Sequence, residues 1–201
     1  MKLLITGFEP FGGEAVNSSF EAISRLPDKI GDVEILKARL PVSFIRSGTT
    51  LETLIMDFGP DTVICVGQAG GYAGIALERV AINLRDAVMP DNDGMKPVDE
   101  PVVPGGPAAY FSSLPVKGMV VALKQNGIPV FVSHSAGTYV CNNVMYTLLH
   151  SIQAKSLPIR GGFIHVPYST EQAVTKPSGT PSMALSQMTR ALELAVRSLM
   201  D

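Results

Sequence analysis

The chain has 201 residues, of which 46% are hydrophobic, enough for one globular domain spanning residues 1–201 with a buried core. Its formal net charge is -2, and no run of Lys or Arg forms a stripe that could neutralise a phosphate backbone, which argues against a nucleic-acid partner. Residues 125–154 carry no Asp, Glu, Lys or Arg, but Gly, Pro, Ser, His and Asn interrupt them too often for a membrane span.

The N-terminal segment, residues 1–13, reads MKLLITGFEPFGG and contains a short apolar stretch that ends at a glycine. A secretory signal peptide has a longer apolar region and a small-residue cleavage site, so this segment predicts a first β-strand instead. We therefore expect a cytoplasmic protein. Because thiols stay reduced in the cytoplasm, we expect Cys65 and Cys141 to be free rather than joined in a disulfide.

Short apolar runs rich in β-branched residues recur along the chain and predict buried strands. Stretches with helical spacing lie between these runs, which indicates an α/β fold with a mainly parallel sheet covered on both sides. Such sheets bind ligands at the carboxyl ends of their strands. The predicted strands are residues 2–6, 33–40, 62–66, 129–133 and 162–166.

Three segments have the apolar spacing of helices. Residues 51–58 stop at Gly59 and Pro60, and a second segment around residues 119–123 is closed by an Asn-Gly pair. Apolar residues at intervals of three and four over residues 185–199 predict a C-terminal helix with Ser182 as its cap. Residues 89–106 are rich in Pro and Gly and predict a long loop, either a flap or an interface arm.

Cys141 lies in the segment AGTYVCNN, between a predicted strand and a predicted helix. If Thr138 caps that helix, the thiol lies in its first turn, where unpaired backbone N–H groups and the helix dipole favour a thiolate and could hold an oxyanion. The alternative is that Cys141 is a small apolar core residue, as we expect for Cys65 in TVICVGQ.

A cysteine nucleophile needs a base, and the chain offers three histidines. His165 ends a predicted buried strand, where this architecture builds sites, and is our candidate base. His134 also follows a strand and either approaches the same pocket or is a hydrogen-bonded structural residue, whereas His150 is expected to be structural. Glu78 is a candidate to orient the base, and its alternative is a solvated charge beside Arg79.

Two glycine-rich loops, TGFEPFGG and GQAGG, each follow a predicted strand. Neither matches a dinucleotide fingerprint or ends in the Gly-Lys-Ser/Thr of a phosphate loop. Their aromatic and amide side chains suit a small, flat, neutral ligand instead. Simple core packing is the alternative for the phenylalanines, and capping a helix that begins near residue 18 is the alternative for the asparagine. The side chains are Phe8, Phe11, Asn17 and Gln68.

Four blocks in this order, TGFEPFGG, VGQAGG followed by ERVAIN, AGTYVCNN, and GFIHVPY, resemble the signature of the pyroglutamyl peptidase I family from Thr6 to the C-terminal helix. The resemblance implies a cysteine peptidase that removes N-terminal pyroglutamate from peptides, with no metal or cofactor. It implies an α/β/α sandwich, often assembled as a homotetramer, although a dimer is an alternative.

Matched by motif, the family's catalytic triad falls on Cys141, His165 and Glu78. The resemblance further implies that Phe8 and Phe11 clasp the pyrrolidone ring, with Asn17 and Gln68 near its polar edge.

Three positions depart from the family pattern. Tyr72 and Val88 stand where arginines are usual, which removes two positive charges from the expected site, and Arg85 is a candidate to compensate for the second. Tyr139 replaces the usual phenylalanine and adds a hydroxyl beside the nucleophile. The missing arginines motivate an alternative, a non-catalytic binder of N-terminally blocked peptides. A nucleoside- or phosphate-processing enzyme is a third hypothesis, which rests on fold analogy alone.

Overall fold

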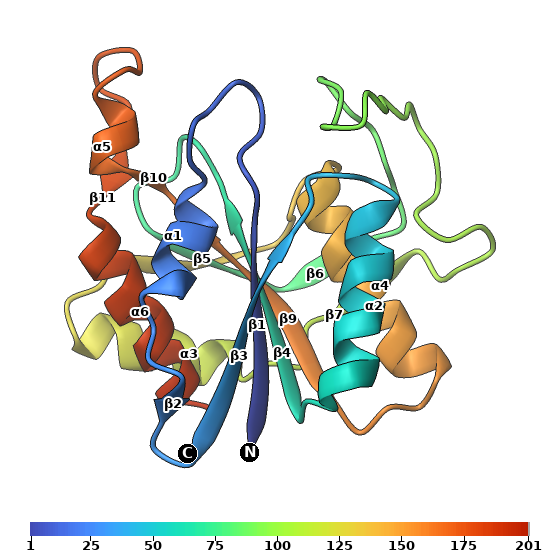
Figure 1. Ribbon diagram of the computed structural model, residues 1–201, viewed down its shortest axis with the longest axis horizontal. Coiled ribbons are helices and arrows are strands. Elements are labelled where there is room, and N and C mark those ends of the chain that lie inside the picture. The colour runs from blue at the N-terminus through green and yellow to red at the C-terminus, as the bar shows by residue number, and fades with distance from the viewer. Residues whose placement is uncertain (201) are drawn as a thin grey trace.

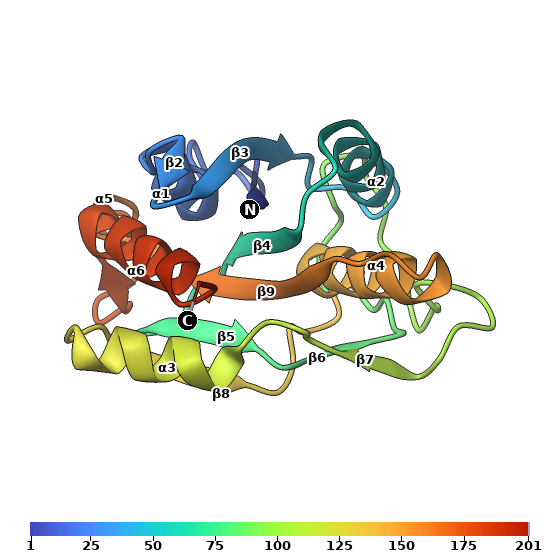
Figure 2. The same ribbon diagram turned by 90° about the horizontal axis from the view of Figure 1, so that it is seen from below.

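The computed structural model describes residues 1–200, which form a seven-stranded sheet with helices on both faces (Figures 1 and 2). The strand order is β2-β3-β1-β4-β9-β5-β8. These strands are β1 (Lys2–Phe8), β2 (Lys29–Ile30), β3 (Val33–Leu40), β4 (Thr62–Gln68), β5 (Ile75–Glu78), β8 (Val130–Ser133) and β9 (Arg160–Val166).

The helices divide into two layers, as Figure 2 shows. One face of the sheet carries α1 (Ser18–Ser24), α3 (Val116–Gln125) and α6 (Leu185–Arg197), whereas the other carries α2 (Arg46–Phe58) and α4 (Val140–Ala154). The predicted α/β/α architecture is therefore confirmed. No helix within residues 1–200 combines the length and apolar character needed to cross a bilayer.

Strand direction decides where the site can form. The strands β3, β1, β4 and β9 run parallel to one another, so the mainly parallel sheet is confirmed, while the short edge strand β2 is antiparallel to β3. β5 and β8 are parallel to each other, but β5 runs antiparallel to β9. In Figure 1 the loops after β1 and β4 both rise above the upper end of the sheet, while the segment of residues 89–106 runs from the upper right down the side that carries α2 and α4. The loops that follow the parallel strands thus gather at one edge.

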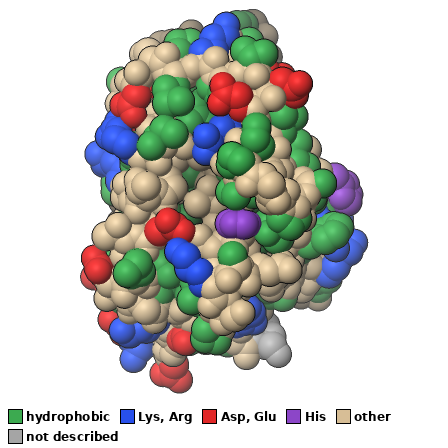
Figure 3. Space-filling view, turned by 90° about the vertical axis from the view of Figure 1, so that its right-hand side faces the viewer, with side chains coloured by type: hydrophobic (Ala, Val, Ile, Leu, Met, Phe, Trp, Pro, Cys, Tyr) green, Lys and Arg blue, Asp and Glu red, His purple; other side chains and the backbone are tan. Residues whose placement is uncertain are grey.

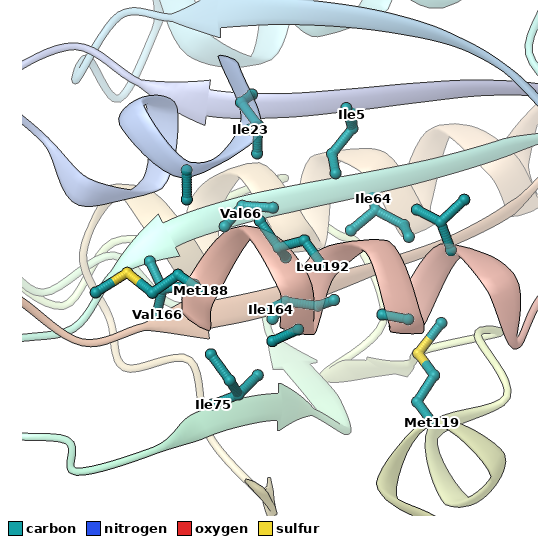
Figure 4. Packing of buried hydrophobic residues seen from close by; sticks show 14 of the residues in the cluster. Ile5, Ile23, Ile64, Val66, Ile75, Met119, Ile164, Val166, Met188 and Leu192 are labelled. Carbon is teal, nitrogen blue, oxygen red and sulfur yellow. The ribbon is translucent and has the colours of Figure 1, made fainter. Parts of the chain in front are cut away.

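Two buried apolar clusters hold the layers together, one on each face of the sheet. In the first, Ile5, Ile64 and Val66 project from the strands toward Met188 and Leu192 of α6 (Figure 4). The second packs α2 and α4 on the opposite face and includes Phe8 and Phe163. Burial of this apolar area is the main force that fixes the strand ends relative to one another.

All five predicted strands are present, within a few residues of their expected ends. α2 ends as predicted at Gly59, whose left-handed φ of 61° suits glycine. The strand β5 is not among the predicted strands, because its four residues follow a glycine-rich loop and end at Glu78, next to the charged Arg79, so no apolar run stands out. Also absent from the predicted elements are the pairs β6 (Val80–Ile82) with β7 (Ala109–Phe111), and β10 (Tyr168–Ser169) with β11 (Ser182–Met183), and the short helix α5 (Thr170–Ala173).

The predicted cap of the C-terminal helix is wrong. Ser182 pairs with Tyr168 in the short ladder of β10 and β11, and the helix begins later, at Leu185 after Ala184. Ser182 is therefore extended. Its pairing with Tyr168 outweighs its preference for a helix cap, and this partner cannot be recognised from the spacing of the sequence.

The predicted loop at residues 89–106 contains no helix or strand, apart from one isolated bridge between Arg85 and Glu100 beside it. Asp91 is 6% exposed and organises this segment. Its carboxylate accepts hydrogen bonds from the backbone N–H groups of Phe44 (2.8 Å), Asp93 (2.9 Å) and Met95 (2.8 Å). The loop is therefore a built structure fastened to the start of α2.

Candidate active site

Cys141 is the second residue of α4, which begins at Val140 after Tyr139 in extended conformation. The first hydrogen bond of the helix runs from Asn143 N to Tyr139 O (3.1 Å), so the N–H groups before it are available at the positive end of the helix dipole. In the part of the chain that the structure describes, no side chain caps this helix. The predicted Thr138 cap is wrong, since its hydroxyl donates to Asp86 O (2.7 Å) instead.

Two asparagines after the cysteine fix the start of α4. Asn142 accepts a hydrogen bond from Ile82 N (3.0 Å) and donates to Ile82 O and Leu84 O. Asn143 donates to Phe44 O (3.0 Å). Both side chains are buried, so they position the first turn and hence the sulfur. Sequence reasoning missed them, although two consecutive Asn inside an apolar helix are a signal of buried amide contacts.

His165 lies on β9, and its imidazole is paired with Glu78 of β5. The distance from His165 Nδ1 to Glu78 Oε1 is 2.8 Å. Ala76 is directly opposite His165 in the ladder, so Glu78, two residues further along, reaches the ring from the diagonal position on the same face. Glu78 is 0% exposed, and the alternative of a solvated charge beside Arg79 is wrong.

The electrostatic balance at His165 favours the imidazolium. Burial lowers the pKa of His165, but the charge and hydrogen bonding of Cys141 and the carboxylate of Glu78 outweigh burial and raise the pKa to about 9. The ring is 5% exposed, so water screens these interactions little. An imidazolium held beside a sulfur is the arrangement that stabilises a thiolate nucleophile.

The second cysteine has a different environment. Cys65 is fully buried on β4, and burial raises the pKa of its thiol to about 12. Both cysteines are free thiols, as predicted. Gly67, two residues after Cys65, passes directly beneath the nucleophile: a Cβ there would lie 2.8 Å from Cys141 Sγ and 2.7 Å from Phe163 Cζ. Only glycine leaves room for the sulfur in this position.

A small pocket lies next to Cys141 and contains all four side chains predicted to bind substrate. Phe8 and Phe11 supply aromatic surface, and the Phe11 ring lies 6.2 Å from the ring of Tyr139, which also lines the pocket. The eight lining residues in the described chain include no Asp, Glu, Lys or Arg. They are Phe8, Phe11, Asn17, Val42, Gln68, Tyr139, Val140 and Cys141.

The side-chain amides of Asn17 and Gln68 differ in how many of their N–H donors have a partner within the protein. Asn17 caps α1: its Oδ1 accepts from Ser19 N (3.1 Å), and its Nδ2 donates to Glu9 O (3.0 Å). Gln68 Oε1 accepts from Ser18 N (2.9 Å) and Gln172 Nε2 (2.9 Å). No acceptor among residues 1–200 takes a hydrogen bond from Gln68 Nε2. Among residues 1–200, Gln68 therefore keeps both N–H groups of its amide unused and Asn17 keeps one, and the capping interpretation of Asn17 holds beside its place in the pocket.

The other two histidines lie elsewhere. His134 is exposed and does not line the pocket, because β8 runs antiparallel to β9 and its carboxyl end does not share the edge of the parallel strands. His150 Nδ1 lies 2.9 Å from the hydroxyl of Tyr110, and its ring stacks on Tyr146 at 6.0 Å. Within residues 1–200, no group of three His, Cys, Asp or Glu is arranged to hold a metal ion.

Comparison with known proteins agrees with this geometry. Residues 1–201 match the sequence family described as pyroglutamyl peptidase. The chain belongs to the pyroglutamyl peptidase family. It is 52% identical to the pyrrolidone-carboxylate peptidase of Thermococcus kodakarensis, over 100% of this chain and 97% of that protein. It is 47% identical to pyrrolidone-carboxylate peptidase 1 of Streptococcus pneumoniae serotype 4, over 100% and 94%.

Solved structures of the pyroglutamyl peptidase family share the fold. Pyroglutamyl peptidase I from Bacillus amyloliquefaciens superposes with a TM-score of 0.95 at 47% identity, covering 98% of this chain and 93% of that one. A variant of pyrrolidone carboxyl peptidase from Pyrococcus furiosus gives a TM-score of 0.95 at 43% identity, covering 100% and 99%. The predicted family resemblance is confirmed.

The structure places each departure from the family pattern. Val88 is 94% exposed and contacts no part of the pocket. Arg85 donates from Nε to Asn143 Oδ1 (2.6 Å) and is not among the pocket residues, so its guanidinium supports α4 rather than the pocket. The added hydroxyl of Tyr139 donates to Pro90 O (2.9 Å) and ties the 89–106 loop to the start of α4. Tyr72 lies beside His165.

Proposed function

We propose that this protein is a cysteine peptidase that hydrolyses the bond after an N-terminal pyroglutamyl residue of peptides and proteins, with Cys141 as nucleophile. The main support for the proposal is that three features lie together at one edge of the sheet. They are the first turn of α4, the buried pair of His165 and Glu78, and an aromatic pocket lined by no Asp, Glu, Lys or Arg. The proposed reaction uses no metal or cofactor.

The pocket supports a pyroglutamyl group over other N-termini. Pyroglutamate is flat, has no ammonium group, and presents one N–H donor and one C=O acceptor on its lactam. Phe8 and Phe11 suit the flat ring, and the unused donors of Gln68 Nε2 suit the lactam carbonyl. A free N-terminal ammonium would find no carboxylate among the lining residues, and an unpaired buried charge is strongly disfavoured. Proline also lacks the lactam carbonyl, so Gln68 would stay unpaired.

The first half of the reaction forms a thioester. The Cys141 thiolate attacks the pyroglutamyl carbonyl carbon, and the negative charge that develops on oxygen is stabilised by the N–H groups of the first turn of α4. Glu78 occupies Nδ1 of His165, so Nε2 is the nitrogen that carries the mobile proton. When the C–N bond breaks, Nε2 gives this proton to the leaving amine, and the peptide departs with a free N-terminus.

The second half regenerates the enzyme. Neutral His165 takes a proton from water through Nε2, and the resulting hydroxide attacks the thioester carbonyl. The C–S bond then breaks, pyroglutamate leaves, and Cys141 returns as a thiolate beside the imidazolium. Glu78 stabilises the imidazolium in both halves without itself taking the proton.

The alternative, a protein that only binds blocked peptides, makes a different prediction. Incubation with a pyroglutamyl peptide should release pyroglutamate, which mass spectrometry detects as loss of the terminal residue. A pure binder leaves the peptide mass unchanged. A matched peptide that begins with proline should stay intact, because its terminal ammonium and missing lactam carbonyl do not suit the pocket.

The nucleophile is tested by Cys141→Ala. We expect the variant to lose turnover of a pyroglutamyl fluorogenic amide while its circular dichroism spectrum and melting temperature stay close to the parent. Cys65→Ala is the matched control, since this thiol is buried away from solvent and should be dispensable for turnover. Substantial turnover by Cys141→Ala, or an equal loss in Cys65→Ala, contradicts the assignment.

We also propose that the protein acts in the cytoplasm as a homo-oligomer, a tetramer or a dimer. Large apolar side chains are exposed on several elements, among them Met56 (79%), Val98 (68%) and Phe111 (73%). Figure 3 shows apolar side chains spread over one face, with acidic and basic groups interspersed among them. Sedimentation velocity across a range of concentrations tests the assembly, and a monomer at every concentration contradicts it.

A further inference from the structure

A tight turn places Tyr72 next to His165. Tyr72 lies in the glycine-rich loop of residues 69–74 between β4 and β5, and its N–H donates to Ala69 O (3.4 Å). Gly71 has φ of 95°, a conformation that other residues rarely adopt. At Gly70 an added Cβ would lie 2.5 Å from the Tyr168 ring, so the loop is pressed against that ring. These restraints return the chain toward the active site at position 72.

The Tyr72 ring completes an enclosure around the imidazole. Its centroid lies 6.2 Å from that of His165, with the ring planes at 89°. Phe163 packs against the same imidazole at 4.8 Å, and Glu78 holds Nδ1. Tyr72 is itself supported by Phe131, whose ring lies 5.3 Å away at 73°. The perpendicular arrangement is a favourable geometry for aromatic rings.

The contact is made by the ring rather than by the hydroxyl. No hydrogen bond of the Tyr72 hydroxyl occurs within residues 1–200, although the side chain is only half-buried. Phe131 touches Tyr72 and has no ring contact with His165. The three aromatic groups therefore form a chain, in which Phe131 supports Tyr72 and Tyr72 supports the imidazole.

We propose that Tyr72 is a positioning residue, whose ring restricts rotation of the His165 imidazole, keeps its Nε2 directed at Cys141, and shields it from water without adding charge. The hydrogen bond to Glu78 fixes one ring nitrogen but leaves the imidazole free to tilt about that bond. Packing by Phe163 and Tyr72 removes this freedom. The inference rests on the proposed function, in which His165 moves the proton.

The charges that face His165 predict what a charged side chain at position 72 would change. Glu78 approaches from β5 and Cys141 from α4, and both favour the imidazolium. From β4, Gly67 is paired with His165 and carries no side chain, and the aromatic ring of Tyr72 faces the imidazole from its loop. A cation placed at position 72 would stabilise the thiolate and destabilise the imidazolium, so both pH limbs of the reaction would move to lower pH.

Four variants test the proposal. We expect Tyr72→Phe to keep kcat within about twofold, because the ring is retained. Tyr72→Ala should lower kcat by about 10- to 100-fold with KM changed far less, because the proton carrier loses its orientation. Tyr72→Arg should shift both limbs of the kcat/KM pH profile downward. Phe131→Ala should give part of the Tyr72→Ala loss and add nothing in the Tyr72→Ala background.

A purely structural role is excluded by measurements that do not need a stability change. The melting temperature of each variant is recorded, and Tyr72→Leu replaces Tyr72→Ala if the smaller side chain prevents folding. Parent-like kcat in Tyr72→Phe, together with a loss in Tyr72→Ala that affects kcat far more than KM, supports the proposal. Parent kcat and an unshifted pH profile in Tyr72→Ala and Tyr72→Arg overturn it.

Alkylation of Cys141 by iodoacetamide separates this inference from the proposed function. Its rate as a function of pH reports the thiolate without any peptide substrate. If the parent protein fails to turn over pyroglutamyl peptides, the proposed function fails. An upward shift of the alkylation profile in Tyr72→Ala, with a parent-like profile in Tyr72→Phe, would then still support positioning of His165 by the ring, whereas identical profiles in all variants reject it.

Discussion

Glu78 Oε1 and His165 Nδ1 lie 2.8 Å apart in a buried pair, although 87 positions separate the two residues in the chain. The pair exists because β5 enters the sheet antiparallel to β9 and brings its last residue to the flank of the imidazole. The carboxylate is fully covered, so its influence on the ring is not diluted by water.

Glu78→Gln should lower kcat strongly, by about 10²- to 10⁴-fold, because the neutral amide no longer stabilises the imidazolium or selects its tautomer. The basic limb of the kcat/KM profile should also move to lower pH, since one cause of the raised His165 pKa is removed. Initial rates on a pyroglutamyl amide between pH 5 and pH 11 measure both effects. An unchanged basic limb would contradict the role given to Glu78.

The free energy of unfolding should also depend on the pair of His165 and Glu78. The pKa of His165 is raised in the folded state from 6.5 to about 9, so protonation stabilises the fold below pH 6.5, and this contribution disappears as pH rises through about 9. In Glu78→Gln the contribution is smaller. The difference in free energy of unfolding between parent and variant should therefore shrink from pH 6 to pH 10 in urea titrations. A difference that grows with pH would reverse the assigned sign.

Gln68→Glu keeps an acceptor for Ser18 and Gln172 but replaces the free NH₂ with an oxygen. The lactam carbonyl of the substrate would then face an acceptor, and we expect KM to rise by about 10- to 100-fold, equivalent to about 1–3 kcal/mol. Asn17→Asp is the matched comparison, because one of the two N–H groups of Asn17 already donates to Glu9 O and fewer donors are left for substrate than at Gln68. Steady-state kinetics should show the larger KM effect at Gln68, and the opposite order would assign the lactam contact to Asn17.

Asp91→Ala should destabilise the protein by about 3 kcal/mol, because three backbone N–H groups lose a buried carboxylate. Asp93→Ala, two residues away, removes a partly exposed ion pair with Arg46 and a contact with Ser43 and should have a much smaller effect. Chemical denaturation of both variants makes the comparison. Equal losses would show that the loop at residues 89–106 is not held by Asp91.

Gly67→Ala should reduce kcat/KM by about 100-fold or more, since the new methyl group would displace Cys141 Sγ. Gly161→Ala is the control: its methyl group would meet Ile152 and Leu148 in the core, remote from the sulfur. We expect Gly161→Ala to cost stability, about 1–3 kcal/mol, while leaving kcat nearly unchanged. Normal kinetics in Gly67→Ala would show that the sulfur does not depend on this space.

Much of the fold could be predicted from the sequence, because a buried strand such as residues 62–68 carries a nearly continuous apolar run and α2 stops at a glycine. Strand direction could not, since the pattern of β5 and β8 is the same whichever way they run. The expectation that His134 could share the pocket depended on the direction of β8. The burial of Glu78 depends on the direction of β5, and a four-residue strand gives no sign that its last side chain faces inward.

The sequence predicts those parts of the candidate site whose roles depend on residues that are neighbours in the chain. Cys141 at a helix start and the aromatic residues of the first loop could be recognised from neighbouring residues alone. The supporting contacts of Asn142, Asn143 and Asp91 could not, because their partners lie about 45 to 100 positions away and are backbone groups with no side-chain signature. Roles that depend on tertiary partners need coordinates.

The three donors that meet at Gln68 Oε1 have a consequence for how the protein selects its substrate. They come from Ser18 at the start of α1 and from Gln172 of α5, 50 and 104 positions away, and together they decide which way the amide faces. This orientation exists only where α1, β4 and α5 meet. A change that removes one of these donors would therefore loosen the amide and weaken selectivity without touching the catalytic residues.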